Sequence, residues 1–322
     1  MSDVQRSGAV GSEPPREAPA TRRTAGRRGR AADDERATVY GFLGLGNMGA
    51  PMAANIAAAG FELVGYDVAG TEGRLAHGAT PASSVDELVE HTDTVLVSVP
   101  DGAVSLAVAE QIAGARQRRA TVVIDLSTVG PVAAQRAAES LAAVDVTYAD
   151  GPVSGGVAGA KARSIALMFS GPEPVFDRHR TLLEAFAGNV FHVGERAGQG
   201  QAMKLLNNFL SATALAASSE AFAVGRAFGL DLRTMVDVVN VSSGRNTATA
   251  DKFPNRVLTG TYDAGFFTRL MAKDVRLFNI VAAEIATPAE VSLAVGAVWD
   301  AFEAAMPASD FSEIWKFVAG VD

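Results

Sequence analysis

The hydrophobic positions of this chain follow one spacing before residue 197 and another after it. From residue 37 to about 196, short apolar runs alternate with stretches in which apolar residues recur at helical spacing. Strands that alternate with helices in this way form a mostly parallel sheet covered on both faces. The predicted strands are residues 39–43, 61–66, 94–99, 121–126, 146–149, 165–170 and 190–193. The predicted helices include residues 51–59, 131–141 and 174–186, each of which begins with a proline.

The second spacing begins at Gly198-Gln199-Gly200. Residues 201–228 contain one glycine, no proline and apolar residues at helical spacing, which predicts a helix roughly 40 Å long. No strand pattern follows it, and further helices are predicted at residues 231–241, 268–285, 288–305 and 312–318. We therefore predict an α/β domain over residues 37–197 and an all-helical domain over residues 198–322, hung on a long interdomain helix.

The first 36 residues have a different composition from the rest. They contain eight arginines, six acidic residues and almost no large apolar side chains, so they cannot bury enough surface to fold. They lack the apolar segment of a signal peptide, and Asp33-Asp34-Glu35 is atypical of an organellar transit peptide. We expect a disordered leader, including one that results from a misplaced start codon. The alternative is an arm around Arg22-Arg23 and Arg27-Arg28-Arg30 that binds nucleic acid or a partner.

Composition narrows the classes of function for the remaining residues. The 322 residues are 48% hydrophobic, contain no cysteine and have no apolar stretch long enough to span a membrane. Disulfides and thiolate chemistry are therefore excluded, and a cytoplasmic location is expected. The leader holds eight of the 28 basic and six of the 36 acidic residues, so the rest carries a net charge of −10. That charge argues against nucleic-acid binding by the folded part.

Histidine and acidic residues give no sign of a metal or of a histidine base. The four histidines are His77, His91, His179 and His192. Each lies near a predicted strand end or on a helical stretch without an associated acid, so we interpret all four as structural. No His, Asp or Glu cluster has the spacing of a metal site, and no metal is expected.

A glycine-rich turn after the first predicted strand indicates dinucleotide binding. Gly44 permits the tight turn, Gly46 lets a pyrophosphate approach the backbone, and Gly49 lets the next helix pack on the strand. Twenty-one residues after Gly46, the second strand ends on Asp67, whose carboxylate is placed to accept from a ribose hydroxyl. This combination predicts a Rossmann-type, doubly wound parallel sheet that binds NAD. The expected cofactor-binding residues of this turn also include Leu45, Asn47 and Met48.

Asp67 also predicts that NAD is preferred over NADP. The 2′-phosphate of NADP would bring negative charge against this carboxylate. Neither Val68 nor Ala69 supplies the arginine that NADP-preferring sites carry here. Arg74 is the one nearby residue whose side chain could reach the 2′-phosphate.

Two further segments carry candidate chemistry. Lys204 and Asn208 lie four residues apart at the start of the long helix, so they share one face. A lysine can lose its proton when it is partly desolvated, whereas an arginine cannot, and the chain has only five lysines. Between two predicted strands, Ser154, Gly155 and Gly156 form a loop whose N–H groups and hydroxyl can converge on a carboxylate. Taken alone, each segment could also be an ordinary surface lysine or turn.

These segments together resemble the β-hydroxyacid dehydrogenase family. The matching motifs are Gly44-x-Gly46-x-x-Gly49, Asp125-Leu-Ser-Thr128, Asp150-Gly-Pro-Val-Ser-Gly-Gly156, Gly198-x-Gly200-x-x-x-Lys204-x-x-Asn207-Asn208 and Lys273-Asp274. The resemblance covers residues 38 to 320, and it implies a helical half like that of 6-phosphogluconate dehydrogenase. It implies that Lys204 is the acid/base, that Ser154, Gly155 and Gly156 hold the substrate carboxylate, and that Asn208 positions the substrate.

The resemblance implies further site residues and leaves the substrate open. Thr128 is expected near the nicotinamide, Val99 and Pro100 are expected in the cofactor site, and Phe266, Lys273 and Asp274 are expected to close the site from the helical half. Arg245 either contacts a second anionic group of the substrate or caps a helix.

The implied activity is hydride transfer between NAD and a small β-hydroxy acid. One alternative is a reductase of the same family that acts on tartronate or succinic semialdehyde. An imine reductase typically lacks the lysine, so Lys204 counts against that activity. A remote alternative is a non-catalytic NAD-sensing module that binds partners through the leader.

The long helix also predicts self-association. Phe209, Leu210, Leu215, Phe222 and Phe228 fall on more than one of its faces. A helix that is apolar around much of its circumference needs cover on several sides. We therefore expect a homodimer or homotetramer.

Overall fold

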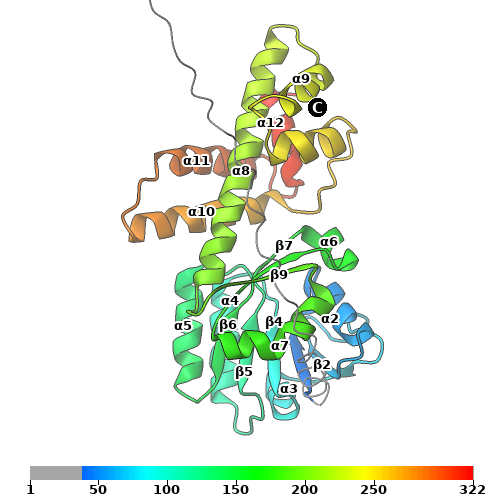
Figure 1. Ribbon diagram of the computed structural model, residues 1–322, viewed down its shortest axis with the longest axis vertical. Coiled ribbons are helices and arrows are strands. Elements are labelled where there is room, and N and C mark those ends of the chain that lie inside the picture. Colours follow the sequence, from blue (N-terminus) through cyan, green and yellow to red (C-terminus); the bar gives the residue numbers. More distant parts are fainter. Residues whose placement is uncertain (1–37, 322) are drawn as a thin grey trace, which may run out of the picture.

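The computed structural model describes residues 38–321, and the predicted leader therefore lies outside the described residues. A nine-stranded sheet with flanking helices forms the N-terminal half, and a long helix connects it to a helical half (Figure 1). No helix among residues 38–321 is both long enough and apolar enough to cross a membrane.

The strand order is β3-β2-β1-β4-β5-β6-β8-β7, with β9 paired to β8. Every pairing from β3 to β6 is parallel, whereas β8 runs antiparallel to both β6 and β7. The strands are β1 (Tyr40–Leu43), β2 (Leu63–Tyr66), β3 (Thr80–Pro81), β4 (Thr94–Val97), β5 (Val122–Asp125), β6 (Thr147–Asp150), β7 (Val153–Ser154), β8 (Ala166–Ser170) and β9 (Asn189–Gly194).

Helices cover both faces of the sheet, as predicted. Met52 and Ile56 of α2 pack with Leu183 of α7 over one face. Leu88 of α3 packs with Ile112 of α4 over the other. The helices of this half are α2 (Gly49–Ala58), α3 (Val85–His91), α4 (Gly102–Gly114), α5 (Pro131–Ala142), α6 (Gly156–Ala162) and α7 (Glu173–Phe186).

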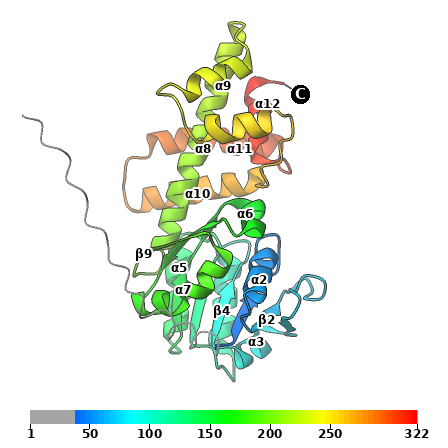
Figure 2. The same cartoon turned by 45° about the vertical axis from the view of Figure 1, so that its right-hand side comes forward.

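The connecting helix α8 spans Gln199–Ala227, close to the predicted 201–228. It runs from the sheet through the middle of the helical half, where α10 and α11 lie side by side across it (Figures 1 and 2). The other elements are α9 (Leu232–Asn240), η1 (Ala248–Val257), α10 (Thr268–Glu284), α11 (Glu290–Ala305), η2 (Phe311–Glu313) and α12 (Ile314–Ala319).

The helical half has its own apolar core. Phe222 of α8, Trp299 and Phe302 of α11 and Phe311 of η2 are buried together. No helix was expected at η1, a π-helix that contains Pro254, because a proline inside a helix normally breaks it. No strand was expected at β3 or β7, because two-residue strands are too short to show alternation.

Candidate active site

A cavity of about 550 Å³ lies between the sheet and the helical half. The glycine-rich turn after β1, the loops after β4 and β5, the loop from β7 into α6, α8 and the start of α10 all contribute to its wall. The structure therefore brings most of the predicted site residues together. Those that line the cavity are Gly46, Asn47, Met48, Gly49, Val99, Pro100, Thr128, Ser154, Gly155, Gly156, Lys204, Asn208, Phe266, Lys273 and Asp274.

Gly44, Leu45 and Asp67 lie outside this lining. A Cβ built on Gly44 would meet Ser98 O at 2.1 Å, so only glycine fits this turn. Leu45 is buried, while its backbone N–H donates to Asp67 Oδ2 at 2.7 Å. The Asp67 carboxylate at the end of β2 is therefore tied to the glycine-rich turn.

The turn leaves room and donors for a phosphate group. A Cβ on Gly46 would project into open space, whereas one on Gly49 would lie 1.9 Å from Gly44 O. The backbone N–H groups of Gly46, Asn47 and Met48 donate to no acceptor within residues 38–321. Free N–H groups before the first turn of α2 suit a pyrophosphate, so these residues fit a dinucleotide.

Asp67 faces two backbone donors and one cation. Ala69 N donates to Asp67 Oδ1 at 2.8 Å, and Arg74 Nη1 lies 3.6 Å from the same oxygen. Val68, the next residue, is 90% exposed and carries no charge. Arg74 therefore neighbours the carboxylate, as its position in the sequence allowed.

The first turn of α8 is fixed to the sheet by Asp150 at the end of β6. Asp150 Oδ1 accepts from Gly198 N at 2.7 Å and from Ser170 Oγ at 2.9 Å, while Oδ2 accepts from Gln201 N at 2.9 Å. Burial raises the pKa of the Asp150 carboxyl to about 6, although these three donors oppose the rise. A Cβ on Gly200 would lie 2.6 Å from Asp150 Oδ2, which explains why this position is occupied by glycine.

Gln201 connects α8 to the loop after β5. Its Oε1 accepts from Val129 N at 2.9 Å and from Gly130 N at 3.2 Å, and its Nε2 donates to Ser127 O at 2.9 Å. Sequence reasoning missed this role, although the residue stands inside the quoted motif. Gln201 therefore fixes the position of Thr128, which lies between these contacts.

Lys204 is buried in the cavity wall, with 6% of its surface exposed. Within residues 38–321 its ammonium makes no hydrogen bond or ion pair. Burial lowers the pKa of Lys204 to about 8, with Asp274 opposing the shift and Lys273 adding to it. A lysine with this pKa can exchange a proton near neutral pH.

Polar contacts join α8 to α10 beside Lys204. Asn208 Nδ2 donates to Asp274 Oδ2 at 2.6 Å, and Lys273 Nζ lies 3.3 Å from Asp274 Oδ1. Lys273 Nζ also donates to Thr128 O at 2.8 Å. Asn207 Nδ2 reaches Ser154 Oγ at 3.4 Å. Asn208, Ser154 and Thr128 are thus connected around one cavity, and Asn207 is an additional contact that the sequence reasoning had not assigned a role.

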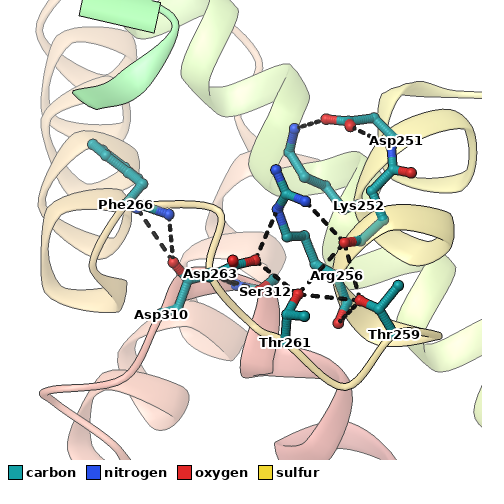
Figure 3. A network of polar contacts seen from close by, with 11 residues as sticks. Asp251, Lys252, Arg256, Thr259, Thr261, Asp263, Phe266, Asp310 and Ser312 are labelled. Carbon is teal, nitrogen blue, oxygen red and sulfur yellow. Dashed lines mark hydrogen bonds and ion pairs between the residues drawn. The ribbon is translucent and has the colours of Figure 1, made fainter. Parts of the chain in front are cut away.

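Asp310 holds the loop that brings Phe266 into the cavity wall. Asp310 Oδ2 accepts from Gly265 N at 2.8 Å and from Phe266 N at 3.3 Å (Figure 3). Asp263, in the same loop, forms an ion pair with Arg256 Nε of η1 at 3.3 Å. The bonds to Asp310 were not predicted, because they join segments 44 and 45 residues apart in the sequence.

Two basic residues, Arg245 and Lys252, differ in whether they line the cavity. Arg245 is exposed, does not line the cavity, and its side chain has no hydrogen bond or ion pair within residues 38–321. No contact of the Arg245 side chain therefore supports either of its two expected roles. Lys252 of η1, which was not a candidate, does line the cavity.

The histidines lie away from the cavity lining. Burial lowers the pKa of His179 to about 4, and its ring lies 3.4 Å from Tyr40 OH. Among residues 38–321, no three His, Cys, Asp or Glu residues lie close enough to hold a metal ion.

Two family models match the chain. Residues 39–194 match the NAD binding domain of 6-phosphogluconate dehydrogenase, and residues 198–318 match the model described as NAD-binding of NADP-dependent 3-hydroxyisobutyrate dehydrogenase. The boundary between the two matches falls where α8 begins.

Relatives with named activities cover most of the chain. A 3-hydroxyisobutyrate dehydrogenase of Pseudomonas aeruginosa is 36% identical, over 88% of this chain and 100% of its own length. A 2-(hydroxymethyl)glutarate dehydrogenase of Eubacterium barkeri is 31% identical, over 76% of this chain and 82% of its own length. The solved structure of Mycobacterium tuberculosis 3-hydroxyisobutyrate dehydrogenase with L-serine is 34% identical and has a TM-score of 0.81, covering 87% of this chain and 99% of that one.

Proposed function

Because the chain belongs to the β-hydroxyacid dehydrogenase family, we propose that it oxidises a small β-hydroxy acid with NAD and uses Lys204 as the general base. Membership makes it an oxidoreductase with NAD(P)-binding domains. The choice of substrate, the preference for NAD and the role of the lysine are our proposal.

One observation carries the proposal. Lys204, with a pKa lowered to about 8, lines the same cavity as the donor-rich turn at Gly46. Asn208, one turn further along α8, shares this wall and is oriented by Asp274. A proton acceptor therefore lies in the cavity that has free donors for a dinucleotide.

The glycine-rich turn, Asp67 and Thr128 would bind the cofactor. The backbone N–H groups at Gly46, Asn47 and Met48 would hold the pyrophosphate, and Asp67 would accept from a ribose hydroxyl. A bound nicotinamide supplies hydride acceptance at its C4 atom. Thr128 would border the nicotinamide: its carbonyl accepts from Lys273, and its neighbours Ser127 and Val129 are bound by Gln201.

At the substrate, Ser154, Gly155 and Gly156 would hold the carboxylate, and Asn208 would orient the hydroxyl. Lys204 Nζ takes the hydroxyl proton as the hydride leaves the hydroxyl-bearing carbon. In the reverse direction the protonated Lys204 returns this proton to the carbonyl oxygen of the semialdehyde. The same residues therefore serve a dehydrogenase and its alternative, a semialdehyde reductase.

The proposed substrate is a 3-hydroxyisobutyrate-like acid. The relatives are named for 3-hydroxyisobutyrate and 2-(hydroxymethyl)glutarate, and one was solved with L-serine. All three compounds have a hydroxymethyl group on the carbon that bears a carboxylate. We propose that Lys204 and the Ser154 loop recognise this hydroxymethyl group and the neighbouring carboxylate.

The test is a dehydrogenase screen with NAD and with NADP. The acids are 3-hydroxyisobutyrate, L-serine, glycerate, threonate, 4-hydroxybutyrate and β-hydroxyaryl acids, and formation of reduced nicotinamide is followed by absorbance. We expect turnover with at least one hydroxymethyl acid and much slower turnover with its neutral alcohol analogue. Equal rates with acid and neutral alcohol, or no turnover with any acid in either direction, would contradict the proposal.

A further inference from the structure

The cavity has a positive lining although the chain as a whole is acidic. Lys204, Lys252, Arg269 and Lys273 line it, against the single acidic residue Asp274, whereas the chain has a net charge of −8. Lys273 is paired with Asp274 at 3.3 Å. Arg269 is exposed and lies over the Phe267 ring. Lys252 is therefore the half-buried cation of this lining that the proposed reaction does not use.

Lys252 stands on a fixed part of the backbone. The next residue, Phe253, is fully buried and packs edge-on against Phe222 of α8 and Trp315 of α12, with ring centroids 4.8 and 5.7 Å apart. The Lys252 side chain is 24% exposed and pairs with the Asp251 carboxylate, which is 51% exposed (Figure 3). An ion pair whose carboxylate is largely exposed contributes little to stability, so a ligand can replace Asp251 at small cost.

The polar lining continues past the catalytic lysine. Ser211 lies seven residues after Lys204 on α8, about 10 Å along the helix axis, and both residues line the cavity. Lys252 lines the same cavity from η1, which packs against α8. The site therefore offers polar groups beyond those that a single carboxylate and one hydroxyl would use.

We propose that Lys252 binds a second anionic group, at the far end of a hydroxy acid whose first carboxylate lies against the Ser154 loop. This inference rests on the proposed function and specifies its substrate class: hydroxy acids that carry a distal carboxylate or phosphate. The sequence had suggested Arg245 for a second anion, and the structure assigns the role to Lys252, because Arg245 lies outside the cavity lining.

The experiment measures binding without turnover, by calorimetry on the enzyme saturated with NADH. The probes are succinate, glutarate and adipate, each compared with its own monoamide, which keeps the chain length and removes one charge. The best length is then repeated with a phosphonate at one end, which distinguishes a distal phosphate from a distal carboxylate. The variants are Lys252→Gln, Lys252→Arg and, as a matched control, Arg245→Gln, which removes an exposed cation outside the cavity.

We expect at least one diacid to bind wild type about tenfold more tightly than its monoamide, or the phosphonate to do so, since a hydrogen bond to a charged group is worth about 10–150-fold. Lys252→Gln should abolish this ratio, Lys252→Arg should restore part of it, and Arg245→Gln should match wild type. A ratio below about threefold for every probe, or a ratio that Lys252→Gln leaves intact, would overturn the inference.

Because none of these probes reacts, the result is independent of the dehydrogenase screen. Failure of that screen with intact charge-selective binding would count against the proposed reaction and not against Lys252. Turnover in the screen without charge-selective binding would count against Lys252 alone.

Discussion

Asn208 Nδ2 of the connecting helix donates to Asp274 Oδ2 of α10 across 2.6 Å, while both side chains are buried. Both ends of the Asn208 amide therefore have a partner: Nδ2 donates to Asp274, and Oδ1 accepts from Asn207 Nδ2 at 3.0 Å. The helical half thereby orients a side chain that the sequence had assigned to substrate positioning.

Lys204→Ala should lower turnover severely while NAD still binds, because the expected cofactor contacts lie mainly on the sheet half. Positioned proton transfer is worth about 10²–10⁴-fold. Steady-state kinetics and calorimetric titration with NAD measure the two effects separately. Retention of more than about a tenth of the wild-type kcat would show that the lysine is not the acid/base.

The pH dependence of oxidation should follow the lowered pKa of Lys204, about 8. Oxidation needs the neutral amine, so kcat/KM for the hydroxy acid should rise about tenfold per pH unit below that value and level off above it. Reduction of the semialdehyde needs the ammonium, so its kcat/KM should be level below that value and fall about tenfold per pH unit above it. A profile for oxidation that stays flat from about pH 6.5 to 9 would contradict this assignment.

Ser154→Ala and Asn208→Ala should act mainly on substrate handling. A lost hydrogen bond to a charged group costs roughly 1.5–3 kcal/mol, or about 10–150-fold in kcat/KM for the acid. The control is the KM for NAD, which should change little. Unchanged kinetics in both variants with the best acid would rule out the proposed carboxylate and hydroxyl contacts.

Wild type should have a higher kcat/KM with NAD than with NADP, because the Asp67 carboxylate repels a 2′-phosphate. Asp67→Asn keeps an oxygen for the Leu45 N–H, which donates across 2.7 Å, and removes the charge. With Arg74 then unpaired, the NADP/NAD ratio of kcat/KM should rise by roughly tenfold or more. Wild-type efficiency with NADP that equals or exceeds that with NAD would refute this preference.

The helical half should mediate self-association. Met203, Leu206 and Leu210 form one exposed apolar stripe on α8, and Phe228 after its end is 84% exposed. Light scattering at micromolar concentration should give a mass of at least twice 33.3 kDa.

The double variant Leu206→Glu, Leu210→Glu should lower this mass, whereas Phe191→Glu on the sheet half should not. An active monomer of wild type would refute the prediction. Leu215 and Phe222, which the sequence also suggested for subunit contacts, are covered by this chain's own core.

The glycine-rich turn and the start of α8 could be predicted from the sequence, because characteristically spaced glycines mark both places. Gly44 and Gly200 leave no room for a Cβ, and such restrictions leave a recognisable spacing of glycines. The mostly parallel sheet was predictable for a similar reason, since each buried strand is a short apolar run between helices.

The part of the cavity wall that Phe266 and η1 form could not be predicted in this way. Phe266 was inferred from the family resemblance, but its position depends on Asp310, 44 residues away. The helix η1 contains Pro254, and a proline in a helix interior argues against a helix. Lys252 of η1 was therefore not among the candidates, whereas Arg245, which was, lies outside the cavity lining.

The contacts at the start of α8 bear on whether the sheet half and the helical half can be separated. The predicted domain boundary at 197/198 stays a prediction, and it falls directly beside Gly198 and Gln201, whose partners belong to the sheet half. A polypeptide cut there would leave the buried Asp150 carboxylate without two of its three donors. The two halves are therefore distinct in architecture and yet not interchangeable modules, and a chimera that swaps the helical half must carry the Asp150 and Gln201 contacts with it.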